Sequence, residues 1–151
     1  MLILTVCIFV GLMFLFQPLR KNNFYSLHLI LVMAMAWFVE SQYFSRATAA
    51  FWVAKWQVAL IYVLFLHLIS INIVTFLAYG FDKKAAIRKD RRIPENHLHA
   101  LEFLGGWIGA ILGQKIFNHK TKKTSYQSFF WAMLIMEILV IFIILKYLHI
   151  V

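Results

Sequence analysis

The sequence is poor in the residues and motifs that define the commonest soluble enzymes and disulfide-stabilised proteins. It has one cysteine, Cys7, so an intrachain disulfide is excluded and cysteine usage does not identify the redox compartment. It contains no glycine-rich phosphate-binding loop, no His-Glu-x-x-His motif, no Cys-x-x-Cys motif and no strand-forming nucleic-acid module. The absence of these motifs excludes the enzyme classes that they define. We also do not expect a nucleic acid as a partner.

Charged residues are also scarce. Only 14% of the 151 residues are charged, whereas 63% are hydrophobic and 17% aromatic, and the mean hydropathy is +0.79. A soluble domain of this size cannot hide so much apolar surface in a single core. The surplus must face lipid, which predicts an all-α membrane protein whose Trp and Tyr residues serve chiefly as interfacial anchors.

Four apolar stretches are long enough, or nearly so, to cross a hydrocarbon layer that requires about 20 helical residues. They cover residues 1–16, 25–43, 56–79 and 129–151. The first stretch lacks the basic start and the small-residue cleavage site of a signal peptide, so we expect it to be a retained span. Residues 1–55 would then hold two N-terminal transmembrane helices, and residues 56–151 would form the core of the protein.

Acidic residues are few, and the basic excess is confined to one region. The chain has 15 Lys and Arg against six Asp and Glu, and ten of the 15 lie between Lys83 and Lys123. Because Lys and Arg are retained on the cytoplasmic side, residues 81–126 should face the cytoplasm of a bacterial inner membrane, with both termini outside. This basic cytoplasmic loop is expected to contact the anionic headgroups of membrane lipids.

Glycine is also uncommon, with six residues, yet four of them fall within residues 95–117. Gly105, Gly109 and Gly113 recur every four residues, a stripe that lets a second helix, or a second copy of the chain in a homodimer, approach closely. The pair Gly105-Gly106 is a turn signal that can divide a helix into two arms. A fifth span would carry Glu102 into the apolar layer, so the sequence favours a re-entrant hairpin over a fifth span here.

Acid/base residues lie in and around this segment. Pro94 suits the first turn of a helix, so a helix should start near residue 94. On that helix Glu95, His99 and Glu102 share one face. Such a face can act in general acid/base catalysis or, together with His119, bind a divalent metal. The alternative is structural, with Glu95 as a helix-terminal charge, His99 as an interfacial residue and Glu102 as a partner of Lys115 or a nearby Arg.

Whether there is one polar site or two depends on the same segment. His119 lies 20 positions beyond His99, about 30 Å away along a straight helix, so the two meet only if the chain folds back at the glycines. The shared site would then have Asp82 as an acceptor and four cations for an anion, namely Lys83, Arg92, Lys120 and Lys123. Asn72 is expected to bond a neighbouring helix.

Several short motifs follow one another in residues 69–130. In order they are Asn72-x-x-Thr75-Phe76, Tyr79-Gly80-x-Asp82-Lys83-x-x-Ala86, Arg92-Ile93-Pro94-Glu95-x-x-Leu98-His99, Gly105-Gly106-x-x-Gly109-Ala110 and His119-Lys120-Thr121-x-Lys123. This succession resembles the small bacterial membrane proteins of domain-of-unknown-function family DUF1294. Residues 56–151 are then a family-like core preceded by two further spans, where some members of the family carry a cold-shock domain.

The resemblance implies site residues but no activity. His97 and Glu102 stand outside the family pattern, and Tyr126 stands where phenylalanine is usual. Emphasis therefore moves from Glu102 to the positions that match the motifs, which are Asp82, Lys83, Arg92, Glu95, His99, His119, Lys120 and Lys123.

Together these features favour an integral membrane protein whose cytoplasmic-side polar site binds a phosphate-bearing or other anionic ligand, such as a lipid headgroup or a nucleotide. In that site Glu95, His99 and His119 would orient the ligand or transfer protons. One alternative is a metal-dependent membrane enzyme that uses the Glu/His cluster. Another is a small transporter in which Glu137 and Asn72 line the path.

Overall fold

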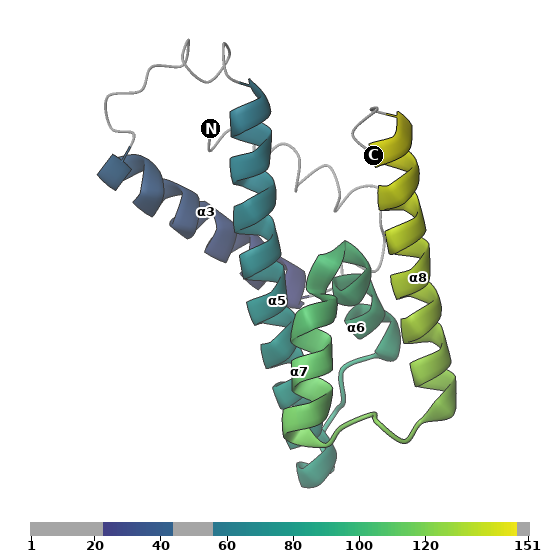
Figure 1. Ribbon diagram of the computed structural model, residues 1–151. Coiled ribbons are helices and arrows are strands. Elements are labelled where there is room, and N and C mark those ends of the chain that lie inside the picture. Colours follow the sequence, from purple (N-terminus) through teal and green to yellow (C-terminus); the bar gives the residue numbers. More distant parts are fainter. Residues whose placement is uncertain (1–22, 44–55, 148–151) are drawn as a thin grey trace. The chain divides into compact units, whose positions relative to one another are not determined.

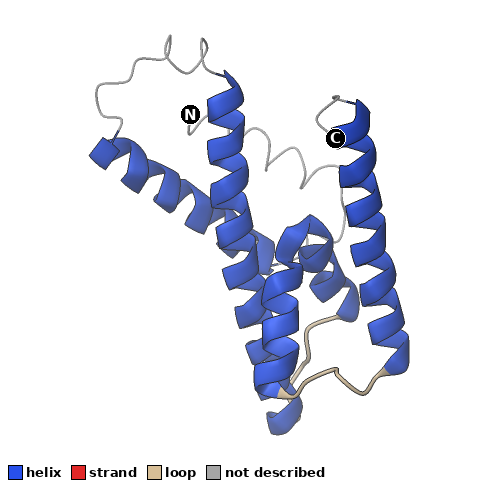
Figure 2. Ribbon diagram, in the orientation of Figure 1, coloured by secondary structure: helices blue, strands red, loops and turns tan. Residues whose placement is uncertain are grey.

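The computed structural model describes residues 23–43 and 56–147. All the elements in these ranges are helices (Figure 2). They are α3 (Asn23–Tyr43), α5 (Trp56–Arg88), α6 (Glu95–Leu101), the π-helical turn η1 (Glu102–Gly106), α7 (Trp107–Phe117) and α8 (Thr124–Tyr147). The all-α class is confirmed, and the first expected span, residues 1–16, lies outside the described residues. The chain divides into two compact units, Met1–Val74 and Thr75–Val151, and the boundary falls inside α5.

Three of the described helices are long and apolar enough to cross a membrane. The candidate spans are Asn23–Ser41 in α3, Ile61–Arg88 in α5 and Thr124–Ile143 in α8. Along α8, large apolar side chains such as Met136, Leu139 and Phe142 are at least half exposed. Water disfavours such a surface, whereas the hydrocarbon layer of a membrane accommodates it.

The first unit joins α3 to the first part of α5 through a small apolar core and a set of polar contacts. Val32 and Val63 are buried against each other. His28 Nδ1 lies 2.8 Å from Ser70 Oγ, and His28 Nε2 lies 3.0 Å from His67 Nδ1. Because lipid offers no hydrogen-bond partner, buried polar groups on apolar helices stabilise the packing by bonding one another.

The helix α5 continues beyond its expected end at Tyr79. It runs without interruption to Arg88, and the chain then turns at Lys89, whose φ is 60°. The Asp90 amide donates to the Ala85 carbonyl at 3.0 Å and so closes the last turn. Asp82 and Lys83 therefore lie on a regular helix and not in the following loop.

The segment from Glu95 to Phe117 is divided into two helical arms. The first arm, α6, begins one residue after Pro94, close to the predicted start, and η1 separates it from the second arm, α7 (Figure 1). Within η1, Gly105 has a φ of 95°, a left-handed conformation that residues with a side chain rarely adopt. The expected interruption of the helix at the paired glycines is therefore present.

Two glycines let this segment lie directly against α5. A Cβ atom on Gly106 would overlap Thr75 Oγ1 and lie 2.6 Å from the Leu101 carbonyl oxygen. A Cβ atom on Gly113 would lie 2.7 Å from the Cβ of Tyr79. Both positions therefore leave no room for a larger residue, and Gly113 is the member of the glycine stripe that packs against α5 in this way.

We expect Gly106→Ala to destabilise the protein by about 1–3 kcal/mol, because the added methyl group must displace the Thr75 side chain or the Leu101 carbonyl. The measurement is denaturant or thermal unfolding of the full chain in detergent micelles. Leu112→Ala, at a position of α7 that is 47% exposed, is the control and should shift the midpoint far less. Equal stability of Gly106→Ala and the wild type would contradict the close packing of η1 on α5.

Candidate functional site

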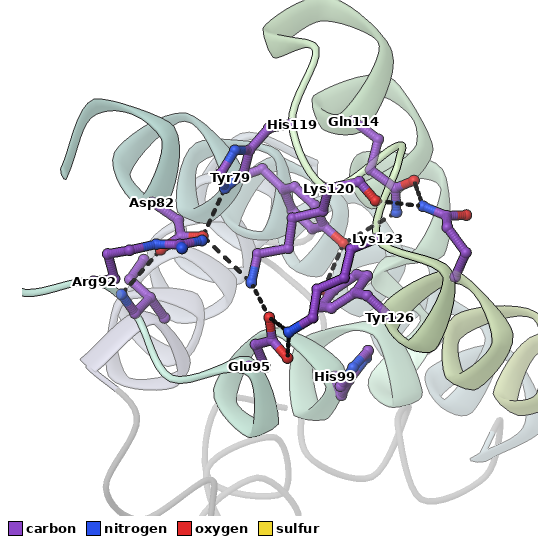
Figure 3. A network of polar contacts seen from close by, with 12 residues as sticks. Tyr79, Asp82, Arg92, Glu95, His99, Gln114, His119, Lys120, Lys123 and Tyr126 are labelled. Atoms are coloured by element: carbon purple, nitrogen blue, oxygen red, sulfur yellow. Dashed lines mark hydrogen bonds and ion pairs between the residues drawn. The ribbon is translucent and has the colours of Figure 1, made fainter. Parts of the chain in front are cut away.

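The carboxylate of Asp82 is the centre of a polar cluster near the C-terminal end of α5 (Figure 3). Its side chain is completely buried. Asp82 Oδ1 accepts from the Ile93 amide at 3.1 Å. Asp82 Oδ2 contacts three cationic or titratable groups: Arg92 Nη2 at 3.1 Å, His119 Nε2 at 2.7 Å and Lys120 Nζ at 3.5 Å. A buried charge requires partners of this kind, so Asp82 fixes the residues before α6 and those after α7 to the same point on α5.

A second carboxylate, that of Glu95, closes the outer side of this cluster. Its Oε1 accepts from Lys120 Nζ at 3.0 Å, and Lys123 Nζ lies 2.7 and 2.9 Å from its two oxygens. The hydrogen bond from Lys123, with a further one from Lys120, holds the pKa of Glu95 below its usual value even though partial burial opposes this. Glu95 is therefore ionised at neutral pH, and with a 40% exposed side chain it lies at the surface of the cluster.

Lys120 lies between the two carboxylates, as Figure 3 shows. Its side chain is only 3% exposed, and its Nζ also lies 4.7 Å from the centre of the Tyr126 ring. The backbone at Lys120 has a φ of 61°, and at Asn118 a φ of 47°, conformations that are uncommon for residues other than glycine. Backbone of this kind is retained where surrounding contacts determine it, and the ion pairs of Lys120 are such contacts.

A buried hydrogen-bond network centred on Glu102 lies beside this cluster. Glu102 itself is only 2% exposed. Glu102 Oε1 accepts from the hydroxyl groups of Tyr79 and of Tyr126, the latter at 2.6 Å. Its Oε2 lies 2.6 Å from His99 Nδ1. Gln114 Nε2 donates to the Tyr79 hydroxyl at 3.1 Å. The carboxylate thus accepts from groups on α5, α6 and α8, and it holds these helices around η1.

The role of Glu102, which stands outside the family pattern, differs from the one that the sequence predicts. The sequence predicts Lys115 or an Arg as its structural partner. The partners are instead Tyr79, Tyr126 and His99. The two tyrosines are buried hydrogen-bond donors and not interfacial anchors. The available signal was Glu102 itself, because a carboxylate inside an apolar segment needs donors and both tyrosines lie in the region of the motifs.

The structure brings His99 and His119 into two adjoining networks rather than one pocket. His119 belongs to the Asp82 cluster and His99 to the Glu102 network. The two networks meet at Tyr126, whose ring stacks on that of His99 with a centroid distance of 4.3 Å and also lies under Lys120 Nζ. The chain therefore folds back between the two histidines as the turn signal predicts.

A surface cavity of about 550 Å³ opens at the Asp82 cluster. Its lining includes four cations, Arg92, Lys120, Lys122 and Lys123, together with Glu95 and His119. The Arg92 side chain is 50% exposed and that of Lys123 is 53% exposed. The lining of the cavity is thus predominantly cationic, and three of its residues, Arg92, His119 and Lys120, contact the buried carboxylate of Asp82.

Other expected site residues lie elsewhere. Lys83 follows Asp82 on α5 and is not part of the cavity lining. Gly109 is buried on α7. Asn72 Nδ2 donates to the Leu68 carbonyl of its own helix at 2.8 Å.

The candidate metal ligands are not gathered into a metal centre. No group of three or more His, Cys, Asp or Glu side chains within residues 23–43 and 56–147 is placed to hold a metal ion. Glu95 faces Lys120 and Lys123, while His99 faces Glu102 and His119 faces Asp82. The metal site proposed from the sequence therefore finds no support in this geometry.

We expect Asp82→Asn to lower the free energy of unfolding by about 3–5 kcal/mol, because it removes the charge that pairs with the buried Lys120 and with Arg92. Unfolding of the full chain in detergent micelles measures the change. Asp90→Asn removes the same charge from an exposed position and should have little effect. If the two variants are equally stable, Asp82 does not organise the cluster.

Comparison with known proteins places this site inside a known family. The family model described as protein of unknown function (DUF1294) matches residues 72–126. The uncharacterised protein YsdA of Bacillus subtilis (strain 168) is 33% identical over 75 residues, which make up 50% of this chain and 84% of that protein. No solved structure matches the chain. Asp82, Glu95, Glu102, His119 and Lys120 all lie within the region that the family model matches. The chain therefore belongs to the DUF1294 family.

Proposed function

We propose that this protein binds a phosphate-bearing or otherwise anionic ligand in the cavity at the Asp82 cluster. The observation that supports this is the composition of the lining, in which four cations accompany one carboxylate, Glu95. Even with the buried Asp82 included, positive charge exceeds negative charge around the cavity. A concave cationic surface focuses its field outward and favours an anion.

Two of the lining residues have donors to offer. Arg92 donates to Asp82 through Nη2, but its guanidinium carries five N–H donors and its side chain is half exposed. Lys122 is exposed and has no acidic partner among the described residues. The planar fork of an arginine together with the point charge of a lysine is a combination that proteins use for phosphate groups.

The proposed location is the cytoplasmic face of a bacterial inner membrane. The lengths of the two arms support a segment that enters the membrane and returns over one that crosses it. At a rise of 1.5 Å per residue, the 11 residues of α7 extend about 16 Å, roughly half of a hydrocarbon layer of about 30 Å. The α6 arm has seven residues and is shorter still. The cationic cavity would then lie at the level of the inner-leaflet headgroups.

Neutralising the exposed cavity cations should weaken binding. In the triple variant Arg92→Gln, Lys122→Gln, Lys123→Gln, we expect the affinity for dihexanoyl phosphatidic acid to fall at least about tenfold, or 1.4 kcal/mol. Isothermal titration of the full chain in detergent micelles measures it.

The matched control removes equal charge outside the cavity, in the triple variant Lys84→Gln, Arg88→Gln, Lys89→Gln, and should retain most of the affinity. An equal loss in both triple variants would show that diffuse attraction, and not the cavity, accounts for the binding.

Cysteine labelling tests the topology. In a Cys7→Ser background, single cysteines at positions 97 and 118 are treated with a membrane-impermeant thiol reagent. Both should react in inverted vesicles, whose outer face is the cytoplasmic one, and neither should react in right-side-out vesicles. Both residues lie near the ends of the α6–η1–α7 segment. If the cysteine at position 118 reacts only in right-side-out vesicles, the segment crosses the membrane as a fifth span and the re-entrant topology is wrong.

A further inference from the structure

The geometry points to Glu95 as an internal competitor that occupies the anion position of the cavity, so that the ligand must be a phosphomonoester dianion able to displace it. This inference rests on the anion-binding function proposed above and names the class of anion. The positions of Glu95, Lys120 and Lys123 carry it.

The Glu95 carboxylate lies where a bound anion would lie. It lines the cavity and accepts hydrogen bonds from both Lys120 and Lys123 at 2.7–3.0 Å. These are the distances of charge-assisted hydrogen bonds between an ammonium group and a bound carboxylate or phosphate. In the structure the two lysines are thus occupied by an anion that the chain itself supplies.

Of all the acidic contacts in the cluster, those of Glu95 are the ones that a ligand can replace. Asp82 is completely buried and is held by a backbone amide as well as by side chains. Glu95 is 40% exposed, and its partner Lys123 is 53% exposed. The hydrogen bonds of Asp82 with Arg92, the Ile93 amide and His119 do not involve Glu95, so the Glu95 side chain can turn toward solvent without breaking them.

The exchange sets a requirement on charge. A phosphodiester carries one negative charge, as Glu95 does, so replacing Glu95 with it exchanges one monoanion for another and gains little. A phosphomonoester above its second pKa of about 6 carries two charges and three acceptor oxygens. It can therefore serve Lys120 and Lys123 and still offer an oxygen to Arg92 or Lys122. Displacing Glu95 costs every ligand the same free energy, so an anion binds well only if it serves the lysines better than the carboxylate does, as a dianion can.

The test compares two short-chain lipids at pH 8 in detergent micelles, dihexanoyl phosphatidic acid as the monoester and dihexanoyl phosphatidylglycerol as the diester. We expect the wild-type chain to bind the monoester at least about tenfold more tightly. Glu95→Gln keeps the shape of the side chain and removes the competing charge. Because displacement of Glu95 costs each ligand the same free energy, this variant should bind both lipids more tightly by a similar factor, at least about tenfold. Asp90→Asn, which removes an exposed acid outside the cavity, should keep the wild-type affinity for both lipids.

The outcomes separate this inference from the function on which it rests. If Glu95→Gln binds both lipids no more tightly than the wild type does, Glu95 is a structural ion-pair partner and the competitor role is wrong. If the wild type binds both lipids equally, the requirement for a dianion is wrong. If neither lipid binds to the wild type or to Glu95→Gln, the anion-binding function fails as well.

Glycerol 3-phosphate and inorganic phosphate are tested in the same way, to distinguish a soluble ligand from a lipid headgroup. Binding as tight as that of phosphatidic acid identifies a soluble ligand, and weaker binding identifies a lipid headgroup.

A measurement on the unaltered chain guards against loss of fold in the variant. With ¹³C-labelled glutamate, saturating dihexanoyl phosphatidic acid should move the carboxyl resonance of Glu95 toward that of a solvent-exposed glutamate. The resonance of the buried Glu102 should stay in place. A Glu95 resonance that does not respond to bound lipid would show that the carboxylate remains on its lysines, and the proposed exchange would be excluded.

Discussion

The cavity depends on the contacts of one buried group, the carboxylate of Asp82. It is fixed on a regular helix, and it holds the Ile93 amide, Arg92, His119 and Lys120. These groups come from two connections that lie far apart in the sequence, one before α6 and one after α7. A buried ion pair contributes little net stability compared with a well-packed apolar alternative, but losing one partner of such a pair is costly. The carboxylate therefore specifies geometry more than it adds stability.

The second constraint is the close approach of the α6–η1–α7 segment to α5. Gly106 lies against Thr75 and Gly113 against Tyr79, with no space for a Cβ atom at either position. This approach brings Glu102 within hydrogen-bond distance of the Tyr79 hydroxyl. Helix packing and hydrogen bonding are thus coupled here, because the absence of side chains at Gly106 and Gly113 lets the Glu102 carboxylate reach the Tyr79 hydroxyl. No side-chain polar atom that is buried within the described residues lacks a hydrogen-bond partner.

The two polar networks have different characters. The Glu102 network is buried and is built mostly from neutral donors, and it holds the helices together. The Asp82 cluster opens to solvent through Glu95, Arg92 and Lys123, all of them at least 40% exposed. Tyr126 lies between the networks, in contact with both Lys120 and His99. Gln127 adds a second link, because its Nε2 donates to Gln114 Oε1 and to the Lys120 carbonyl. Tyr126 and Gln127 therefore connect Lys120, which lines the cavity, to the hydrogen bonds that hold the helices together.

The sequence by itself determined the helical class, the apolar spans at residues 25–43 and 56–79, the start of a helix near Pro94 and the break at Gly105-Gly106. All of these follow from local composition, periodicity and backbone preference. It also indicated most of the charged residues of the Asp82 cluster, namely Asp82, Arg92, Glu95, Lys120 and Lys123, because these positions match a family pattern. Only the tertiary structure decided which carboxylate meets which partner. Glu102 bonds Tyr79 and Tyr126, which are 23 and 24 residues away, and Lys83 stays outside the cavity although Lys120 enters it. Such pairings depend on the angle at which short helical arms pack on α5, and no local rule of sequence encodes that angle.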